Sequence, residues 1–248
     1  MAGLTANKAC ALMATNERTE QTAFLLHSIP YRETSLIVDL FTREHGRIAA
    51  VAKGARRRQS ALRSVLMSFQ PIRVVLAGRN ELRILIGAEW SGGLLAPDGD
   101  ALICGFYMNE LLIKLLARED PHPQLFDAYS EALRSFSSGS GLDATLRIFE
   151  WQLLRETGYA PDLRHDAEGA LIDASHSYRW TPNAGFMVSE PDESSAVSGA
   201  TLTDIHTGQF QTAQARYQAK ALTRTIISHH LNGAPIHSRQ ILIDLQKL

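Results

Sequence analysis

The sequence has very few cysteines and no long apolar segment. Its two cysteines, Cys10 and Cys104, are far apart, so they cannot supply a disulfide framework or a zinc site of the usual four-ligand kind. No uninterrupted apolar run approaches the roughly 18 residues that a membrane span needs. The apolar stretch from Ala9 to Ala14 is too short for the core of a signal peptide. We therefore expect a cytoplasmic protein that makes no membrane contact.

Recognisable catalytic and metal-binding motifs are also missing. There is no helical HExxH pair, no nucleophile elbow, and no lysine after Gly139-Ser140-Gly141 to make a phosphate-binding loop. Among the nine histidines, His229 and His230 are adjacent, and adjacent side chains on a helix point in different directions. We expect no cofactor, no metal and no enzymatic activity. An enzyme whose site is assembled by the fold from scattered His and Asp residues is the alternative.

Positive charge is concentrated in one part of an otherwise nearly neutral chain. The chain is 45% hydrophobic and 21% charged, which is ordinary for a globular protein and excludes a wholly disordered one. Between Gln21 and Trp90 there are eleven Lys and Arg residues and five Asp and Glu residues, a net charge of +6. The rest of the chain must therefore carry −7 to give the total of −1. Arginine dominates the basic part, and its planar guanidinium suits phosphate oxygens and stacking on bases. The alternative is an arginine-rich solvated surface.

The basic segment has the pattern of a small β-barrel. Short apolar runs separated by turn residues predict five strands, at 23–26, 35–41, 48–52, 72–76 and 82–86. Gly46 lies where a tight hairpin turn is needed, and Leu82, Ile84 and Ile86 alternate onto one face, as in a half-buried strand. A stretch at 60–66 between the third and fourth strands can form a helix. This order matches the five-stranded OB-fold, although an SH3-like barrel has a similar strand count.

After Trp90 the apolar residues recur at helical spacing. Helices are predicted at 102–116, 125–136, 142–157, 211–231 and 238–245. Residues 161–199 are polar and broken, with a small hairpin expected around Tyr178 to Val188. The predicted fold class is α+β: a loose extension at 1–20, an OB-fold at 21–90, and an α-helical domain at 98–248 with an irregular, zinc-free insertion at about 161–200.

The candidate site is a cationic loop on the barrel. Residues 53–58 contain four cations within six residues, and Gly54 lets the backbone turn there. Single-strand binders combine such a basic track with aromatic rings on which bases stack, and Tyr31 is the best candidate ring. We expect the DNA-contacting residues to be Tyr31, Arg32, Arg43, Arg47, Lys53, Arg56, Arg57, Arg58, Arg63, Arg73 and Arg79. The alternative for the loop is a solubilising, nonspecific role.

Several segments together resemble RecO, a family of bacterial recombination mediators. The N-terminal segments are 26–36, 39–42, 46–47, 51–56 and 69–71. The later ones are 107–112, 125–126 with Tyr129, 146–147, 149–150, 158–159, 231–236 and 238–239. The resemblance covers about residues 21–245 and is weak at 161–202. The combination is specific, although no single segment is.

The resemblance implies an N-terminal OB-fold and a helical domain in a non-enzymatic DNA repair protein associated with the nucleoid. RecO proteins bind single- and double-stranded DNA, anneal complementary strands, and with RecR help RecA to displace single-strand-binding protein (SSB). Some members carry a four-cysteine zinc module after the Gly-Tyr motif. This chain has no cysteine after Tyr159, so the module should be metal-free or collapsed.

The resemblance also implies binding of the acidic, hydrophobic SSB tail on the helical domain. Such a tail needs a cation and an apolar groove. Arg147 is the candidate cation, and the candidate lining residues are Leu112, Leu116, Leu125 and Tyr129. Alternatively, Arg147 pairs with Glu150 or Asp143 and the apolar residues are core. A different function, an OB-fold RNA-binding module in translation or tRNA handling, is the second hypothesis.

Overall fold

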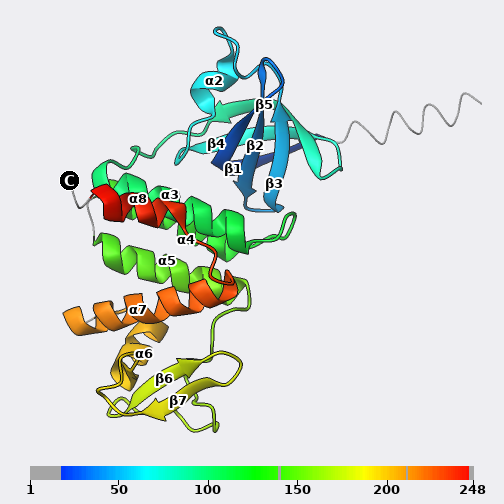
Figure 1. The fold of residues 1–248 in the computed structure, drawn as a ribbon. Helices are drawn as coiled ribbons and strands as arrows, with labels where there is room; N and C mark the ends of the chain where they lie inside the picture. The colour runs from blue at the N-terminus through cyan, green and yellow to red at the C-terminus, as the bar shows by residue number, and fades with distance from the viewer. Residues whose placement is uncertain (1–17, 139–140, 211, 246–248) are drawn as a thin grey trace, which may run out of the picture. The chain divides into compact units, whose positions relative to one another are not determined.

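A computed structural model describes residues 18–138, 141–210 and 212–245 (Figure 1). Contacts divide the chain into an N-terminal unit that ends at Ser137 and a C-terminal unit that begins at Ser138. The N-terminal unit contains the barrel and two helices that follow it. In the described part of the chain, no helix has both the length and the hydropathy needed to cross a membrane.

The N-terminal unit is built on a closed five-stranded barrel in the order β1-β2-β3-β5-β4 (Figure 1, blue to cyan). Four of its pairings are antiparallel, and β3 pairs with β5 in parallel. This confirms the predicted OB-fold. The strands are β1 (Arg18–Tyr31), β2 (Ser35–Thr42), β3 (Gly46–Ala52), β4 (Pro71–Ala77) and β5 (Leu82–Trp90).

The long strand β1 closes the barrel because it pairs with two neighbours. Its first part, from Arg18 to Phe24, pairs with β4, and its second part, from Ala23 to Tyr31, pairs with β2. A register shift between Leu25 and His27 bends the strand between the two pairings. The hairpin glycine Gly46 has φ of 65°, as its predicted turn position requires.

The barrel core consists of inward-facing apolar residues of all five strands. They include Val38, Leu40, Ile48, Ile72 and Val74, none of which is more than 1% exposed. Helix α2 (Ala61–Val65) lies between β3 and β4, as predicted, and contributes Leu62 and Val65 to the edge of this core.

The expectation that Leu82, Ile84 and Ile86 form the buried face of the last strand is wrong. All three are on one face, but that face is outside, and each of the three is exposed. The inward residue is Leu85, which pairs with the buried residues Ala52 on β3 and Leu76 on β4. The partners therefore decide which of two alternating apolar sets faces the core.

Helices α3 (Gly99–Leu115) and α4 (Pro123–Ser137) complete the core of the N-terminal unit. The ring centroid of Phe24 lies 5.3 Å from that of Phe126 and 5.0 Å from that of Tyr129. Phe41 lies 5.4 Å from Phe126 in the same way. Aromatic pairs at such distances stabilise a contact beyond the area that they bury. The two helices therefore pack on the barrel as part of one core.

The C-terminal unit is helical, with a small sheet inserted. Its helices are α5 (Leu142–Glu156), α6 (Gly199–Thr207), α7 (Ala213–His230) and α8 (His237–Leu245). The strands β6 (Ser177–Thr181), β7 (Gly185–Ser189) and β8 (Val197–Ser198) form a sheet in the order β7-β6-β8. The hairpin expected near Tyr178 is present as β6 and β7, so the insertion is more regular than expected. Helix α6 and strand β8 were not predicted.

The insertion has an apolar core of its own. Tyr178, Phe186 and Val197 are at most 3% exposed, and the Tyr178 hydroxyl accepts a hydrogen bond from the backbone of Asp173 at 2.8 Å. These three side chains, one from each strand, therefore form the buried face of the sheet. Among the described residues, no cluster of three or more His, Cys, Asp or Glu side chains could hold a metal ion.

The contact units do not follow the expected division at residues 90 to 98, because α3 and α4 group with the barrel. Strand β1 begins at Arg18, so the end of the expected extension is part of the sheet. The rest of that extension, residues 1–17, lies outside the described residues.

Candidate nucleic-acid interface

The loop after β3 is shaped by its backbone. Gly54 has φ of 70°, and the backbone N–H groups of Ala55 and Arg57 donate to the carbonyls of Ala52 and Gly54 at 3.4 and 3.0 Å. Ala55 is 1% exposed and anchors the loop to the barrel core, whereas Lys53 and the arginines are exposed. The loop therefore holds its apolar residue inside and its cations outside.

Three hydrogen bonds fasten this loop to the turn between β1 and β2. The backbone N–H of Arg56 donates to the carbonyl of Thr34 at 2.9 Å, and its Nη1 donates to the carbonyls of Glu33 and Arg32 at 3.2 and 3.4 Å. The turn carries Arg32, which has φ of 52° and lies with its Cζ 5.2 Å from the centroid of the Tyr31 ring. The turn that carries Tyr31 and Arg32 is thus held next to the loop at Arg56.

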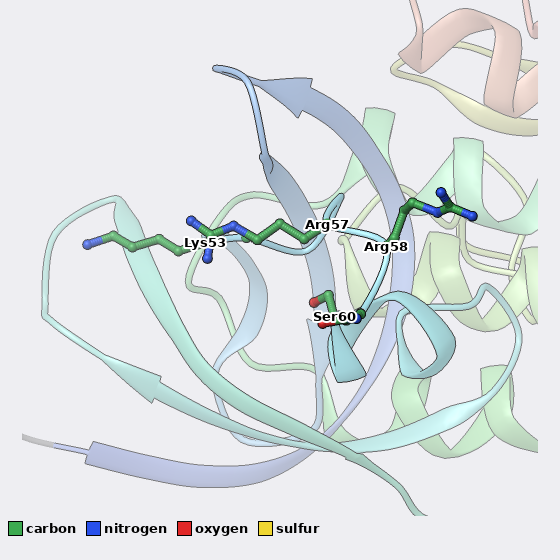
Figure 2. Close-up of a pocket in the computed structure, with 6 residues that line it drawn as sticks. Lys53, Arg57, Arg58 and Ser60 are labelled. Carbon is green, nitrogen blue, oxygen red and sulfur yellow. The ribbon is translucent and has the colours of Figure 1, made fainter.

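An open depression of about 850 Å³ lies on this loop. It is lined by Lys53, Gly54, Arg57, Arg58, Gln59 and Ser60. Figure 2 shows the Lys53 and Arg57 side chains extending in the same direction, whereas Arg58 points away from them. Gln59 and Ser60 were not predicted as site residues; they are polar neighbours that only the loop conformation reveals. We call the turn at Tyr31 and Arg32 together with residues 53–60 the cationic surface.

The other predicted cations are not gathered at this surface. Arg43 follows β2 at the opposite end of the β2–β3 hairpin and makes a bidentate contact with Asp127 at 3.0 and 3.1 Å. This contact raises the pKa of Arg43 and lowers that of Asp127. Arg73 on β4 lies 3.5 Å from Glu20 on β1. Arg63 is exposed on α2, and Arg79 is exposed in the β4–β5 turn.

Arg47 departs most from its predicted role. Its side chain is only 11% exposed, its Nε lies 3.2 Å from Asp39, and its Nη1 donates to the carbonyls of Ile113 and Leu116. Burial lowers the pKa of Arg47, in spite of the neighbouring carboxylate. The guanidinium thus ties β3 to the end of α3, and we remove Arg47 from the candidate interface.

Asp39 is the carboxylate partner of two arginines. Its carboxylate is contacted by Arg47 and also by Arg118, each at 3.2 Å. Burial raises the pKa of Asp39, and the two arginines oppose that effect.

The residues expected to bind the SSB tail are in packed positions. Leu112, Leu116, Leu125 and Tyr129 are all at most 5% exposed, and burial raises the pKa of Tyr129. The Tyr129 hydroxyl donates to Asn109 at 2.6 Å, and Asn109 donates to the carbonyl of Leu26 at 3.0 Å. This arrangement agrees with the alternative in which these residues belong to the core and do not line a groove.

Arg147 is similarly enclosed. It is 4% exposed and lies 2.8 Å from Glu150, which is fully buried. The intrahelical ion pair is the alternative that the sequence left open for this residue.

The histidines near the end of α7 pack against aromatic rings. His230 stacks on Tyr159 with centroids 4.2 Å apart and an interplanar angle of 14°, and His229 meets the edge of Trp180 at 5.6 Å. They line a depression of about 350 Å³ in the C-terminal unit. Burial, followed by the neighbouring His229, lowers the pKa of His230. Packing is the role that the geometry supports for this pair.

Comparison with known proteins matches the chain along most of its length. The family described as "Recombination protein O N terminal" matches residues 13–93, and "Recombination protein O C terminal" matches residues 96–240. A protein of Ralstonia nicotianae named DNA repair protein RecO is 46% identical over 96% of this chain and 89% of its own length. Proteins of the same name from Burkholderia pseudomallei and Azoarcus sp. are 49% and 44% identical. They cover 92% and 95% of this chain, and 84% and 100% of their own lengths.

Proposed function

Since the chain belongs to the RecO family of DNA repair proteins, we propose that it binds single- and double-stranded DNA through the cationic surface. The observation that supports this is the position of Lys53, Arg56 and Arg57. Their loop is fastened by hydrogen bonds to the turn that carries Arg32. Phosphates interact with such groups without regard to sequence.

The proposed activity is mediation of recombination without enzymatic chemistry. Guanidinium and ammonium groups that neutralise phosphates reduce the repulsion between two DNA backbones, so complementary strands can approach and pair. Each phosphate that is neutralised releases counterions, which makes binding sensitive to salt. With RecR, the protein would help to load RecA onto SSB-coated DNA in the nucleoid.

The proposed partner that brings it to coated strands is the SSB C-terminal tail. Tethering raises the local concentration of the protein at SSB-coated DNA without new chemistry. In the proposal the tail binds the helical part of the chain and its carboxylate meets a cation such as Arg147. Because Arg147 is paired with Glu150, the tail would have to displace this contact. Titration of a labelled tail peptide into wild type and Arg147→Ala tests the assignment: equal affinities exclude Arg147.

The first prediction concerns the loop arginines. Replacing Arg56, Arg57 and Arg58 together by alanine should weaken binding to single-stranded DNA. It should also make the slope of log K against log salt shallower by about 2, because about 0.7 counterions are released per single-strand phosphate contact. A fluorescence anisotropy titration at several salt concentrations measures both quantities.

The control removes the same charge elsewhere. Arg155, Arg164 and Arg179 are exposed in the C-terminal unit, and their triple alanine variant has the same net charge as the loop variant. It should retain the wild-type affinity and slope. An unchanged slope in the loop variant would reject the assignment. Preferential binding of structured RNA over single-stranded DNA in competition would favour the RNA-binding alternative.

A further inference from the structure

The outer face of the barrel carries a continuous apolar row across four strands. The register pairs Ile29 on β1 with Ile37 on β2, Ile37 with Val51 on β3, and Val51 with Ile84 on β5. Residues that are directly opposite in a sheet point to the same side, so these four side chains lie next to one another. With neighbouring strands about 4.8 Å apart, the row is about 14 Å long. We call these four residues the apolar row.

The apolar row is open to solvent, although its residues are all β-branched and hydrophobic. Ile29 is 45% exposed and Ile84 is 37% exposed, while Ile37 and Val51 are half-buried. Single exposed apolar residues on a protein surface are ordinary, but four in register form a patch. Such a patch indicates a binding surface.

Positive charge borders the apolar row at one end of its strands. Two residues on from Ile29 and Val51 are Tyr31 and Lys53, which belong to the cationic surface. Two residues away in the other direction along β2 is Asp39, whose carboxylate pairs with Arg47 and Arg118, so the charges at that end are already paired with one another. The apolar row therefore adjoins the cationic surface along one edge, which fits a ligand that has both anionic and apolar parts.

We propose that the apolar row binds the faces of unstacked bases in a single DNA strand, while Lys53 and Arg57 bind the adjoining phosphates. This inference rests on the proposed function and adds the part of the ligand that each surface contacts. In a duplex the base faces are stacked on one another, so only a single strand can place them on the row. A DNA strand is favoured over a second copy of this chain, because the adjoining Lys53 and Arg57 need an anionic partner.

The test separates bases from phosphates. Wild-type protein is titrated with a labelled oligothymidylate and with an abasic strand of the same length, which has the same phosphates and no bases. We expect the wild type to prefer the oligothymidylate by about threefold to tenfold, since each base covers part of the exposed apolar surface. The double variant Ile29→Thr/Ile84→Thr should lose this preference and keep the same salt slope and the same affinity for duplex DNA.

Threonine keeps the branched shape and the strand preference of isoleucine, so the variant should fold, which a thermal unfolding curve verifies. Val51→Thr is a second variant with a single smaller change and should lose part of the preference. The control is Val188→Thr, an exposed position on β7 in the C-terminal unit, which should behave as wild type.

The outcomes distinguish this inference from the proposed function. If the wild type binds both strands equally and with a steep salt dependence, the cationic surface stands and the base-binding row is rejected. If neither strand is bound, the proposed function itself fails. A change in oligomeric state on sedimentation of the double variant, with its preference for bases intact, would instead assign the row to contact between copies.

Discussion

Arg47 shows how the same residue type can serve packing or binding. It is one of eleven cations in the basic segment, and sequence alone places it with the others. Its guanidinium instead satisfies two backbone carbonyls at the end of α3 and the carboxylate of Asp39. A buried guanidinium needs such partners, because a charge without them is costly in the interior.

This placement predicts the effect of Arg47→Ala. The variant should lose about 3 kcal/mol of folding free energy, because Asp39 and the two carbonyls lose a partner in a poorly solvated position. Its salt slope for DNA binding should match that of the wild type. Chemical denaturation measures the first quantity and anisotropy titration the second.

Arg73→Ala is the matched control, since Arg73 is exposed and pairs with an exposed Glu20. Surface pairs of this kind contribute less than about 1 kcal/mol. A stable Arg47→Ala variant with weakened DNA binding would return Arg47 to the interface.

At the scale of single elements, the sequence predicted the strands and long helices well because each has a clear period. Strands β2 to β5 and helices α3, α4, α5, α7 and α8 were expected close to their observed positions, whereas β1 was expected only at 23–26 and runs from Arg18 to Tyr31. Helix α6 was missed because it begins with Ser198, Gly199 and Ala200 at the end of a polar, broken stretch. The structure shows what defines it: the Ser198 side chain accepts from the N–H of Thr201, and Gly208 ends it with φ of 71°.

The candidate site was predicted in part. The loop at 53–58 and the turn at Tyr31 and Arg32 could be found because their cations are close in sequence and follow strand ends. The sequence could not show that Arg43, Arg47 and Arg73 lie away from this loop and turn. Their positions depend on partners that are distant in sequence, namely Asp127, Ile113 and Glu20. The orientation of Ile84 likewise depended on which strands flank β5.

The contact between α7 and the turn after α5 predicts a pH dependence. The pKa of His230 is lowered from 6.5, mainly by burial, so the unfolded chain binds this proton more tightly than the folded protein. Its contribution to stability is therefore complete above pH about 6.5 and is lost as the pH falls through that value toward the folded pKa. We expect the C-terminal unit to unfold at lower urea concentration at pH about 5.5 than at about 7.5.

The measurement isolates this contact. In a Trp90→Phe background, fluorescence reports Trp151 and Trp180, both in the C-terminal unit. His230→Phe keeps a ring to stack on Tyr159 and removes the titrating group. The midpoint of urea unfolding should fall between pH about 7.5 and about 5.5 by more in the protein that keeps His230 than in the His230→Phe variant. An equal fall in both proteins would exclude His230 as the source of the pH dependence.

On the scale of the whole molecule, the compact units and the matched families divide the chain at different places. The boundary between the two family matches lies between residues 93 and 96. The contacts instead place α3 and α4 in the same unit as the barrel, which ends at Ser137. Phe24 and Phe41 are at most 1% exposed because Phe126 and Tyr129 lie over them. The barrel by itself would therefore present two aromatic rings to water.

This division predicts the behaviour of two fragments. Residues 1–137 should unfold cooperatively, because they retain the aromatic contacts and the link from Tyr129 through Asn109 to Leu26. Residues 1–93 should not, since truncation removes both helices. Circular dichroism during heating tests each fragment; a cooperative transition in the shorter one would show that the barrel is independent.

The parallel pairing of β3 with β5 has a consequence for when binding ability arises during synthesis. Residues 53–60 and α2 lie in the chain between these two strands, and the pairing of Ala49 to Ala52 with Leu82 to Leu85 closes that segment into a loop. Closing a loop has an entropic cost that the contacts of the closed state must offset. The β3–β5 pairing can therefore form only after β5 has been synthesised. A nascent chain that has not yet emerged past Leu85 would thus hold every loop arginine on a barrel that is still open.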